Sequence, residues 1–186
     1  MTTQRFEPGP LADVTRERDG DRWTLVFTRD FRHPPELVWA ALTEPAQLKE
    51  WAPFEAAGSL ETLGDTTLTM IDGDRRDETP ATVTRADRPV LLEYTWGGDV
   101  LRWELAPIDT GTRLCLRHTV DDRGWAPKVA AGWHICLAVA DLLLDGRPVG
   151  PIRGTQARDY GWDALNDAYA ERLDQAHDDT AHGDEA

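Results

Sequence analysis

His118 and Tyr94 are the side chains of this sequence best suited to acid–base chemistry. In the stretch around His118, Leu114, Leu116 and Val120 alternate with polar residues, so His118 is predicted on the apolar face of a strand. A neutral imidazole there accepts one hydrogen bond and donates another, which suits either orienting a ligand or removing its proton. A hydrogen-bonded core histidine gives the same pattern. Both interpretations stay open.

The sequence has no other arrangement that indicates a familiar kind of catalysis. No glycine-rich loop follows a strand, no Gly-x-Ser-x-Gly motif occurs, and the histidines and cysteines lack metal-ligand spacing. The acidic run at residues 72–78 carries Arg75 and Arg76 at its centre, which favours a hairpin turn over a calcium loop. We therefore expect no metal and no cofactor, and we assign no catalytic residue.

Large apolar side chains recur at alternate positions in the stretches around His118. Trp103, for example, lies between Arg102 and Glu104, so its indole is predicted on the opposite face from these charges. A ligand-binding surface is predicted from Leu68, Met70, Tyr94, Trp96, Trp103, Leu116, His118, Trp133 and Leu137. Aromatic walls with few polar groups suit a hydrophobic small molecule, although tryptophans in such positions are as often ordinary core.

The elements that must position these side chains begin with a series of short strands. Asp19-Gly20 is a strong hairpin signal between the first two strands, and glycine-containing turns separate the later ones. Strands are predicted at residues 14–18, 22–31, 58–63, 66–71, 80–85, 90–96, 100–105 and 112–120. Short strands joined by tight turns form an antiparallel meander.

Helical patterns account for the remaining elements. Prolines at 34, 35 and 45 suit the first turns of two short clamp helices within residues 33–51. Apolar residues repeat at three and four positions over residues 126–146 and again over 160–176. On the long helix, His134 and Asp141 either flank the pocket or lie on a solvated edge. The predicted fold is α+β: a helix-grip arrangement, in which a curved antiparallel sheet of six or more strands wraps a long helix, with an extra terminal helix.

Length and composition bound the organisation. The 186 residues are predicted to form a flexible tail (1–12), the helix-grip domain (13–146), a C-terminal helical extension (147–176) and a disordered acidic tail (177–186). The net charge of −14 argues against nucleic acid as a partner. Cys115 and Cys136 lie in apolar patterns and no secretory signal or long apolar run precedes them, so we expect a reduced, cytoplasmic protein without membrane insertion. Its terminal helix leaves monomer and homodimer open.

Four segments carry a family resemblance that covers roughly residues 23–146. They are PPELVWAALTEPAQLKEW, VLLEYTW with VLRWEL, GTRLCLRH ending at His118, and GWHICLAVADLLLDG ending at Gly146. In this order they resemble the START-like (SRPBCC, helix-grip) superfamily of polyketide cyclases and lipid-transfer proteins. Within it they are similar to bacterial homologues of the domain that activates the ATPase of the ninety-kilodalton heat-shock chaperone. The resemblance implies a deep hydrophobic cavity between sheet and long helix, and it does not imply one reaction.

Three functions are compatible with this sequence. The first is binding or carriage of a lipid-, polyketide- or steroid-like small molecule, since an aromatic cavity is inferred without a catalytic constellation. The second is a cyclase or dehydratase in which His118 positions or deprotonates a polyketide-like substrate. The third is a chaperone-associated protein, although the short segment before Trp23 has no counterpart of the separate N-terminal domain of the eukaryotic activators.

Overall fold

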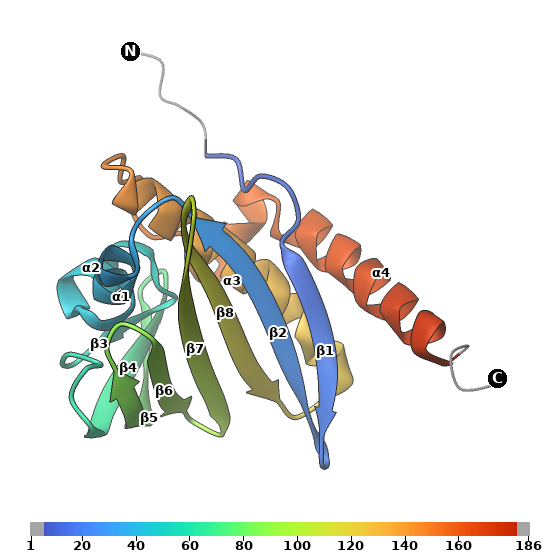
Figure 1. Cartoon of the computed structure of the whole chain (residues 1–186), viewed down its shortest axis with the longest axis horizontal. Helices are drawn as coiled ribbons and strands as arrows, with labels where there is room; N and C mark the ends of the chain where they lie inside the picture. The colour runs from blue at the N-terminus through green and yellow to red at the C-terminus, as the bar shows by residue number, and fades with distance from the viewer. Residues whose placement is uncertain (1–5, 182–186) are drawn as a thin grey trace.

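The computed structural model describes residues 6–181, with side chains described up to residue 176 (Figure 1). Eight antiparallel strands form a single sheet in the order β1-β2-β8-β7-β6-β5-β4-β3. The strands are β1 (Asp13–Asp19), β2 (Arg22–Phe31), β3 (Phe54–Ala56), β4 (Gly64–Asp72), β5 (Arg75–Asp87), β6 (Leu91–Trp96), β7 (Asp99–Ile108) and β8 (Gly111–Val120). The helices are α1 (Pro35–Thr43), α2 (Pro45–Trp51), α3 (Ala126–Leu144) and α4 (Trp162–Ala181), with 3₁₀ turns η1 (Arg123–Trp125) and η2 (Gly154–Tyr160). The predicted α+β helix-grip fold is confirmed.

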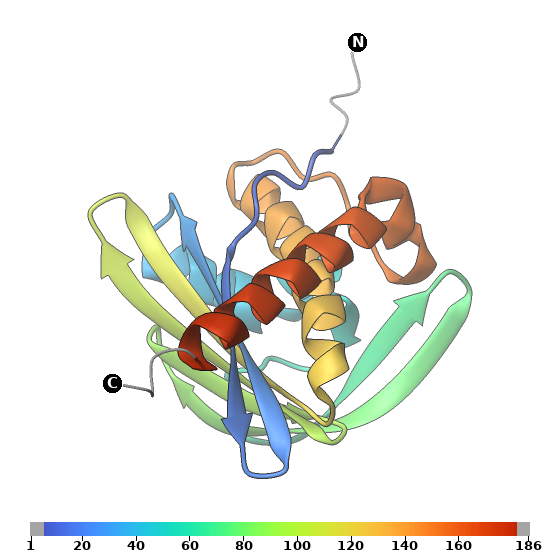
Figure 2. The ribbon, with the colours of Figure 1, turned by 90° about the vertical axis from the view of Figure 1, so that its right-hand side faces the viewer.

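The sheet curves around α3, as the view along its open side shows (Figure 2). α3 lies on the concave face, and α4 crosses over α3 on the side away from the sheet. Because both sides of α3 are covered, its buried residues spread around most of its circumference, from Ala130 to Ala140. The segment Arg123–Leu144 is long and apolar enough to span a membrane by length and composition, but in this fold it is the core helix.

The two clamp helices close one end of the sheet, as the prolines predicted. Pro35 and Pro45 occupy the first turns of α1 and α2, where a missing N–H costs no hydrogen bond. The indole of Trp51 is buried and donates to the carbonyl of Ala41 at 2.9 Å, which ties α2 to α1. Trp51 is therefore part of the core rather than of a cavity entrance.

One predicted strand, at residues 58–63, is wrong. The sheet is instead extended by β3, a few residues earlier, and the predicted segment is a loop. Leu60 anchors this loop: its side chain is fully buried and its N–H donates to the carbonyl of Thr43 at the end of α1. The Glu61 N–H donates to the Ser59 hydroxyl, a local hydrogen bond that competes with strand pairing.

The N-terminal segment differs from the predicted flexible tail over its described part. Phe6 is buried and packs edge-on against Tyr160 with ring centroids 5.7 Å apart. His134, fully buried on α3, donates from Nε2 to the carbonyl of Pro8 at 2.7 Å. His134 thus neither flanks the pocket nor lies on a solvated edge. Residues 1–5 lie outside the described residues.

The C-terminal helix packs on its own chain. Leu165, Tyr169 and Leu173 of α4 are buried against α3 and β1. The Tyr169 hydroxyl accepts from the N–H of Ala12 at 2.9 Å and lies 2.6 Å from Nδ1 of His134, so it joins α4, α3 and the N-terminal segment. α4 also continues to Ala181, into the stretch predicted to be disordered. Residues 182–186 lie outside the described residues.

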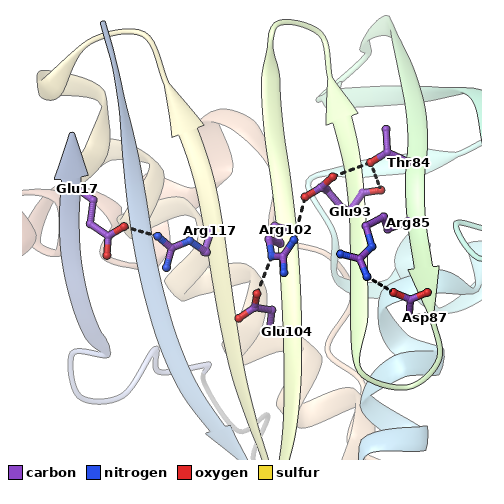
Figure 3. A network of polar contacts seen from close by, with 8 residues as sticks. All are labelled: Glu17, Thr84, Arg85, Asp87, Glu93, Arg102, Glu104 and Arg117. Atoms are coloured by element: carbon purple, nitrogen blue, oxygen red, sulfur yellow. Dashed lines mark hydrogen bonds and ion pairs between the residues drawn. The ribbon is translucent and has the colours of Figure 1, made fainter. Parts of the chain in front are cut away.

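The convex face of the sheet is polar and carries ion pairs within and between strands (Figure 3). Arg102 contacts Glu104 at 2.6 Å and Glu93 at 3.4 Å, and Arg85 contacts Asp87 at 2.6 Å. Exposed pairs of this kind contribute only about 0–1 kcal/mol each. These charged residues occupy the convex face, so the apolar residues of the same strands lie on the concave face.

Candidate functional site

An aromatic cluster fills the space between the β6–β8 part of the sheet and α3. Trp103 and Trp133 meet edge to face with ring centroids 5.1 Å apart, and Trp51 lies 6.4 Å from both. Trp96 lies 6.5 Å from Trp133 and 5.1 Å from Phe54. All of these pairs except the tilted Trp51–Trp133 pair are T-shaped, which is a favoured geometry of aromatic pairs, so the cluster is well packed.

A cavity of about 260 Å³ opens beside this cluster. Its walls come from the sheet, from one face of α3, and from the segment between α3 and α4. The lining residues are Pro53, Met70, Trp96, His118, Val129, Gly132, Trp133, Ile135, Cys136, Ile152, Arg153, Gly154, Ala157 and Trp162. Apolar side chains dominate, which is the usual character of a small-molecule site.

Four predicted residues, Met70, Trp96, His118 and Trp133, line this cavity together. Met70 is also 41% exposed, so it lies at the mouth rather than deep inside. The other five predicted residues do not line it. Leu68, Tyr94, Trp103, Leu116 and Leu137 are fully buried in the core. Alternation correctly assigned the four strand residues among them to the concave face, and Leu137 lies on α3, but packing by α3 and the clamp fills most of that face.

His118 has both ring nitrogens engaged. The indole N–H of Trp133 donates to Nδ1 at 2.9 Å, and Nε2 lies 3.0 Å from Oδ2 of Asp99. An indole nitrogen only donates, so Nδ1 must be the unprotonated nitrogen and Nε2–H donates to the carboxylate. This arrangement fixes the neutral Nε2–H tautomer. Tyr94, the other candidate for acid–base chemistry, accepts instead from Trp103 at 3.1 Å.

Asp99 connects this pair to the surface. Its Oδ1 accepts from Arg22 at 2.6 Å. Burial of the Asp99 carboxyl opposes ionisation, but the hydrogen bond from His118 and the charge of Arg22 outweigh it and hold the pKa below its usual value. The carboxylate is therefore ionised at neutral pH and keeps His118 oriented.

The segment after α3 supplies cavity residues that sequence reasoning missed. Ile152 is buried, and Ala157 and Trp162 follow it on η2 and at the start of α4. On α3, Gly132 leaves open space, since a Cβ built there meets no atom within 4 Å. A signal was present in the sequence: Ile152 directly follows the proline- and glycine-containing stretch 147–151, and an isolated isoleucine there indicates an anchored crossing rather than a free linker.

Two further groups in the lining are chemically distinctive. Cys136 is buried in the apolar wall, and burial raises the pKa of its thiol to about 12, so it is unreactive as a nucleophile at neutral pH. Arg153 is the one fully charged side chain among the described lining residues. Its side chain is only 9% exposed.

A second, polar groove of about 590 Å³ lies at the other end of α3, beside the N-terminal segment. There His33, Asp141 and Asp145 bring ligand atoms within 4.8 Å of one another. However, Arg29 contacts Asp141 at 3.1 Å and Arg147 contacts Asp145 at 2.9 Å. Because arginines already neutralise these carboxylates, the cluster offers a cation little net attraction.

Comparison with known proteins places this geometry in a family. The family described as Activator of Hsp90 ATPase homolog 1-like protein matches residues 32–142, which run from the start of the clamp through most of α3. The chain belongs to this family. The Activator of Hsp90 ATPase homolog 1-like match ends before residues 147–181, so the segment that covers the cavity lies outside it. Comparison with curated proteins gives no match.

Solved structures share the fold of this family member. CalU16 from Micromonospora echinospora superposes with a TM-score of 0.66 at 19% identity, covering 86% of this chain and 95% of CalU16. A conserved protein of unknown function from Enterococcus faecalis superposes with a TM-score of 0.65 at 20% identity, covering 87% of this chain and 91% of that protein. A protein from Mesorhizobium loti superposes with a TM-score of 0.58 at 25% identity, covering 68% of this chain and 99% of that protein. The chain thus has the START-like fold that its sequence resembles.

Proposed function

We propose that this protein binds a small hydrophobic molecule in the cavity between the sheet and α3. The observation that carries the proposal is the cavity itself: an aromatic and aliphatic lining at the edge of a tightly packed core. Typical ligand pockets run from roughly 300 to 1,000 Å³. At about 260 Å³ the cavity suits a bicyclic or short acyl compound better than a whole steroid.

The mouth of the cavity provides the route in. An adjoining groove of about 550 Å³ shares Met70, Val129, Gly154 and Trp162 with the cavity. Trp125 in this groove is 53% exposed, an unusual position for an indole in a soluble protein. A ligand larger than the enclosed space would extend along this groove.

The hydrogen bonding of His118 supports a carrier over a cyclase or dehydratase. A general base needs a free lone pair within reach of the substrate proton. In His118 the only lone pair, on Nδ1, accepts from Trp133, and displacing that donor would leave a buried indole N–H unpaired. Catalysis by His118 would therefore need a rearrangement of Trp133.

A chaperone-associated role is the second candidate, because the family is described by activation of the Hsp90 ATPase. The measurement that addresses it is the steady-state ATPase rate of an Hsp90-type chaperone with and without this protein. A several-fold rise that persists when the cavity is blocked would favour this role over carriage.

The carrier proposal is tested with naphthalene-2-methanol, a neutral bicyclic probe, by isothermal titration calorimetry. The blocking variant is Gly132→Leu, which directs a side chain into open space on α3. The matched control is Gly132→Ala, which adds only a methyl group. We expect saturable binding to the wild type, a modest change in Gly132→Ala and at least a tenfold loss, about 1.4 kcal/mol, in Gly132→Leu. Absence of binding to the wild type, or equal binding by Gly132→Leu, would overturn the proposal.

A further inference from the structure

Arg153 is held rigidly at the cavity wall by backbone carbonyls. Its Nε donates to Ala52 at 2.8 Å, and its Nη2 donates to Lys49 at 3.0 Å and lies 3.4 Å from the carbonyl of Phe54. These acceptors end α2 and begin β3, so the guanidinium also joins the crossing segment to the clamp. A cation fixed in this way is preorganised, since its orientation does not have to be acquired when a ligand binds.

One nitrogen of this guanidinium keeps spare capacity. Nη1 has an ion pair with Oε1 of Glu55, but the separation of 3.6 Å exceeds hydrogen-bond length. Glu55 is shared, because its other oxygen accepts from Arg76 at 2.9 Å. One carboxylate thus faces two guanidinium groups, so the charge of Arg153 is only partly compensated.

Two further cations lie at the mouth of the cavity. Lys128 and Arg158 line the adjoining groove. Asp72, which also lines it, accepts from the N–H and hydroxyl of Thr155. Carboxylates accompany two of the three cations: Glu55 lies 3.6 Å from Arg153, and Asp163 lies 3.8 Å from Arg158. Selection of an anion therefore depends on the fixed guanidinium of Arg153 rather than on the overall charge of the mouth.

We infer that the ligand of this cavity is a small apolar carboxylate, with its ring or acyl body beside Trp96 and Trp133 and its carboxylate against Arg153. Guanidinium and carboxylate have matching planar geometry, and hydrogen bonds between charged groups are stronger than neutral ones. The inference rests on the proposed function, which it narrows to one ligand class. Arg153 lies outside the residues that match the family, so this recognition would belong to the C-terminal extension.

The test compares naphthalene-2-carboxylate with naphthalene-2-methanol, which share a ring system and differ in the charge of the head group. Both are titrated calorimetrically at about pH 7.5, where the carboxylate is ionised. The variants are Arg153→Gln, which removes the charge and keeps a donor, and Arg85→Gln as a matched control. Arg85 pairs with Asp87 on the convex face, far from the cavity, and its loss changes the net charge equally (Figure 3).

We expect the wild type and Arg85→Gln to prefer the carboxylate by about tenfold, and Arg153→Gln to lose that preference while still binding the alcohol. Equal affinity of the wild type for both probes would overturn the inference and leave the proposed function standing. Binding of neither probe would overturn both. A preference that survives in Arg153→Gln would place the head group elsewhere.

Arg153→Gln also loses hydrogen bonds to the clamp, so a second measurement covers the case in which it does not fold. A crystal structure of the wild type with naphthalene-2-carboxylate should place a carboxylate oxygen within about 3.2 Å of an Arg153 nitrogen. A carboxylate pointing to the mouth, away from Arg153, would overturn the inference.

Discussion

Trp133 of α3 donates its indole N–H to Nδ1 of His118 on β8 across 2.9 Å, and this hydrogen bond joins the helix to the sheet inside the cavity wall. Asp99 accepts a hydrogen bond from the other ring nitrogen of His118, so a chain of hydrogen bonds runs from the surface to the cavity wall. The three groups have complementary roles only while His118 is neutral. The relationship therefore gives His118 a structural explanation that needs no substrate.

Substitution of His118 should separate these roles. Leucine in place of His118 leaves the buried Trp133 N–H and one Asp99 oxygen unpaired, so the free energy of unfolding should fall by about 1–3 kcal/mol. Glutamine keeps one acceptor and one donor, and His118→Gln should cost less than half as much. Urea denaturation measures both. Equal losses in the two variants would show that shape, not hydrogen bonding, determines the effect.

A pH dependence is expected from His134. Burial lowers the pKa of His134 below its ordinary value of 6.5, and its hydrogen bonds to Pro8 and Tyr169 use the neutral ring. As the pH falls below 6.5, the unfolded chain takes up this proton before the folded chain does, so stability is full above 6.5 and declines below it. Melting temperatures between about pH 8 and pH 5 should show this decline in the wild type.

His134→Gln provides the comparison, since an amide does not titrate between about pH 8 and pH 5. The difference in melting temperature between the wild type and His134→Gln should shrink as the pH falls through this window. A difference that stays constant with pH would contradict the assignment of the effect to His134.

The sequence was sufficient for the fold because its local patterns and its global architecture agree. Prolines at 34, 35 and 45 start two helices, alternation marks each strand of the sheet from 64 to 120, and α3 has a helical repeat long enough to cross it. The failure at residues 58–63 is local. Leu60 looks like a strand residue, but it is a single anchor for a loop whose hydrogen bonds go to α1 and Ser59.

The site was predicted less completely than the fold. Strand alternation fixes which face a side chain is on, but not whether a neighbour fills the space in front of it. Leu116 and Trp96 share the concave face, yet Leu116 is fully buried in the core and Trp96 lines the cavity. The difference depends on how α3 and the clamp pack over each side chain, which is a tertiary relationship without a local pattern.

The two kinds of tryptophan in this site can be told apart by experiment. Trp103 is only 1% exposed and contacts two other indoles, so Trp103→Ala should cost about 3–5 kcal/mol of stability. Trp96 lines the cavity and is half-buried, so Trp96→Ala should cost less stability and weaken naphthalene-2-methanol binding by roughly fivefold, about 1 kcal/mol. Urea denaturation and calorimetry measure the two effects. If Trp103→Ala folds but loses binding, while Trp96→Ala binds as the wild type does, the ligand lies deeper than the cavity described.

Two glycines of the same helix region should respond oppositely to alanine. Gly132 is inside α3 and a Cβ there meets nothing within 4 Å, so Gly132→Ala should raise the free energy of unfolding by about 0.5–1 kcal/mol through the lower entropy of the unfolded chain. Gly146 follows α3 with φ of 72°, and its N–H donates to the carbonyl of Leu143. Alanine at 146 must adopt this left-handed conformation, so Gly146→Ala should lower stability by about 1 kcal/mol. Thermal and urea unfolding of both variants check the signs. A destabilised Gly132→Ala would show that the space beside Gly132 is narrower than the structure has it.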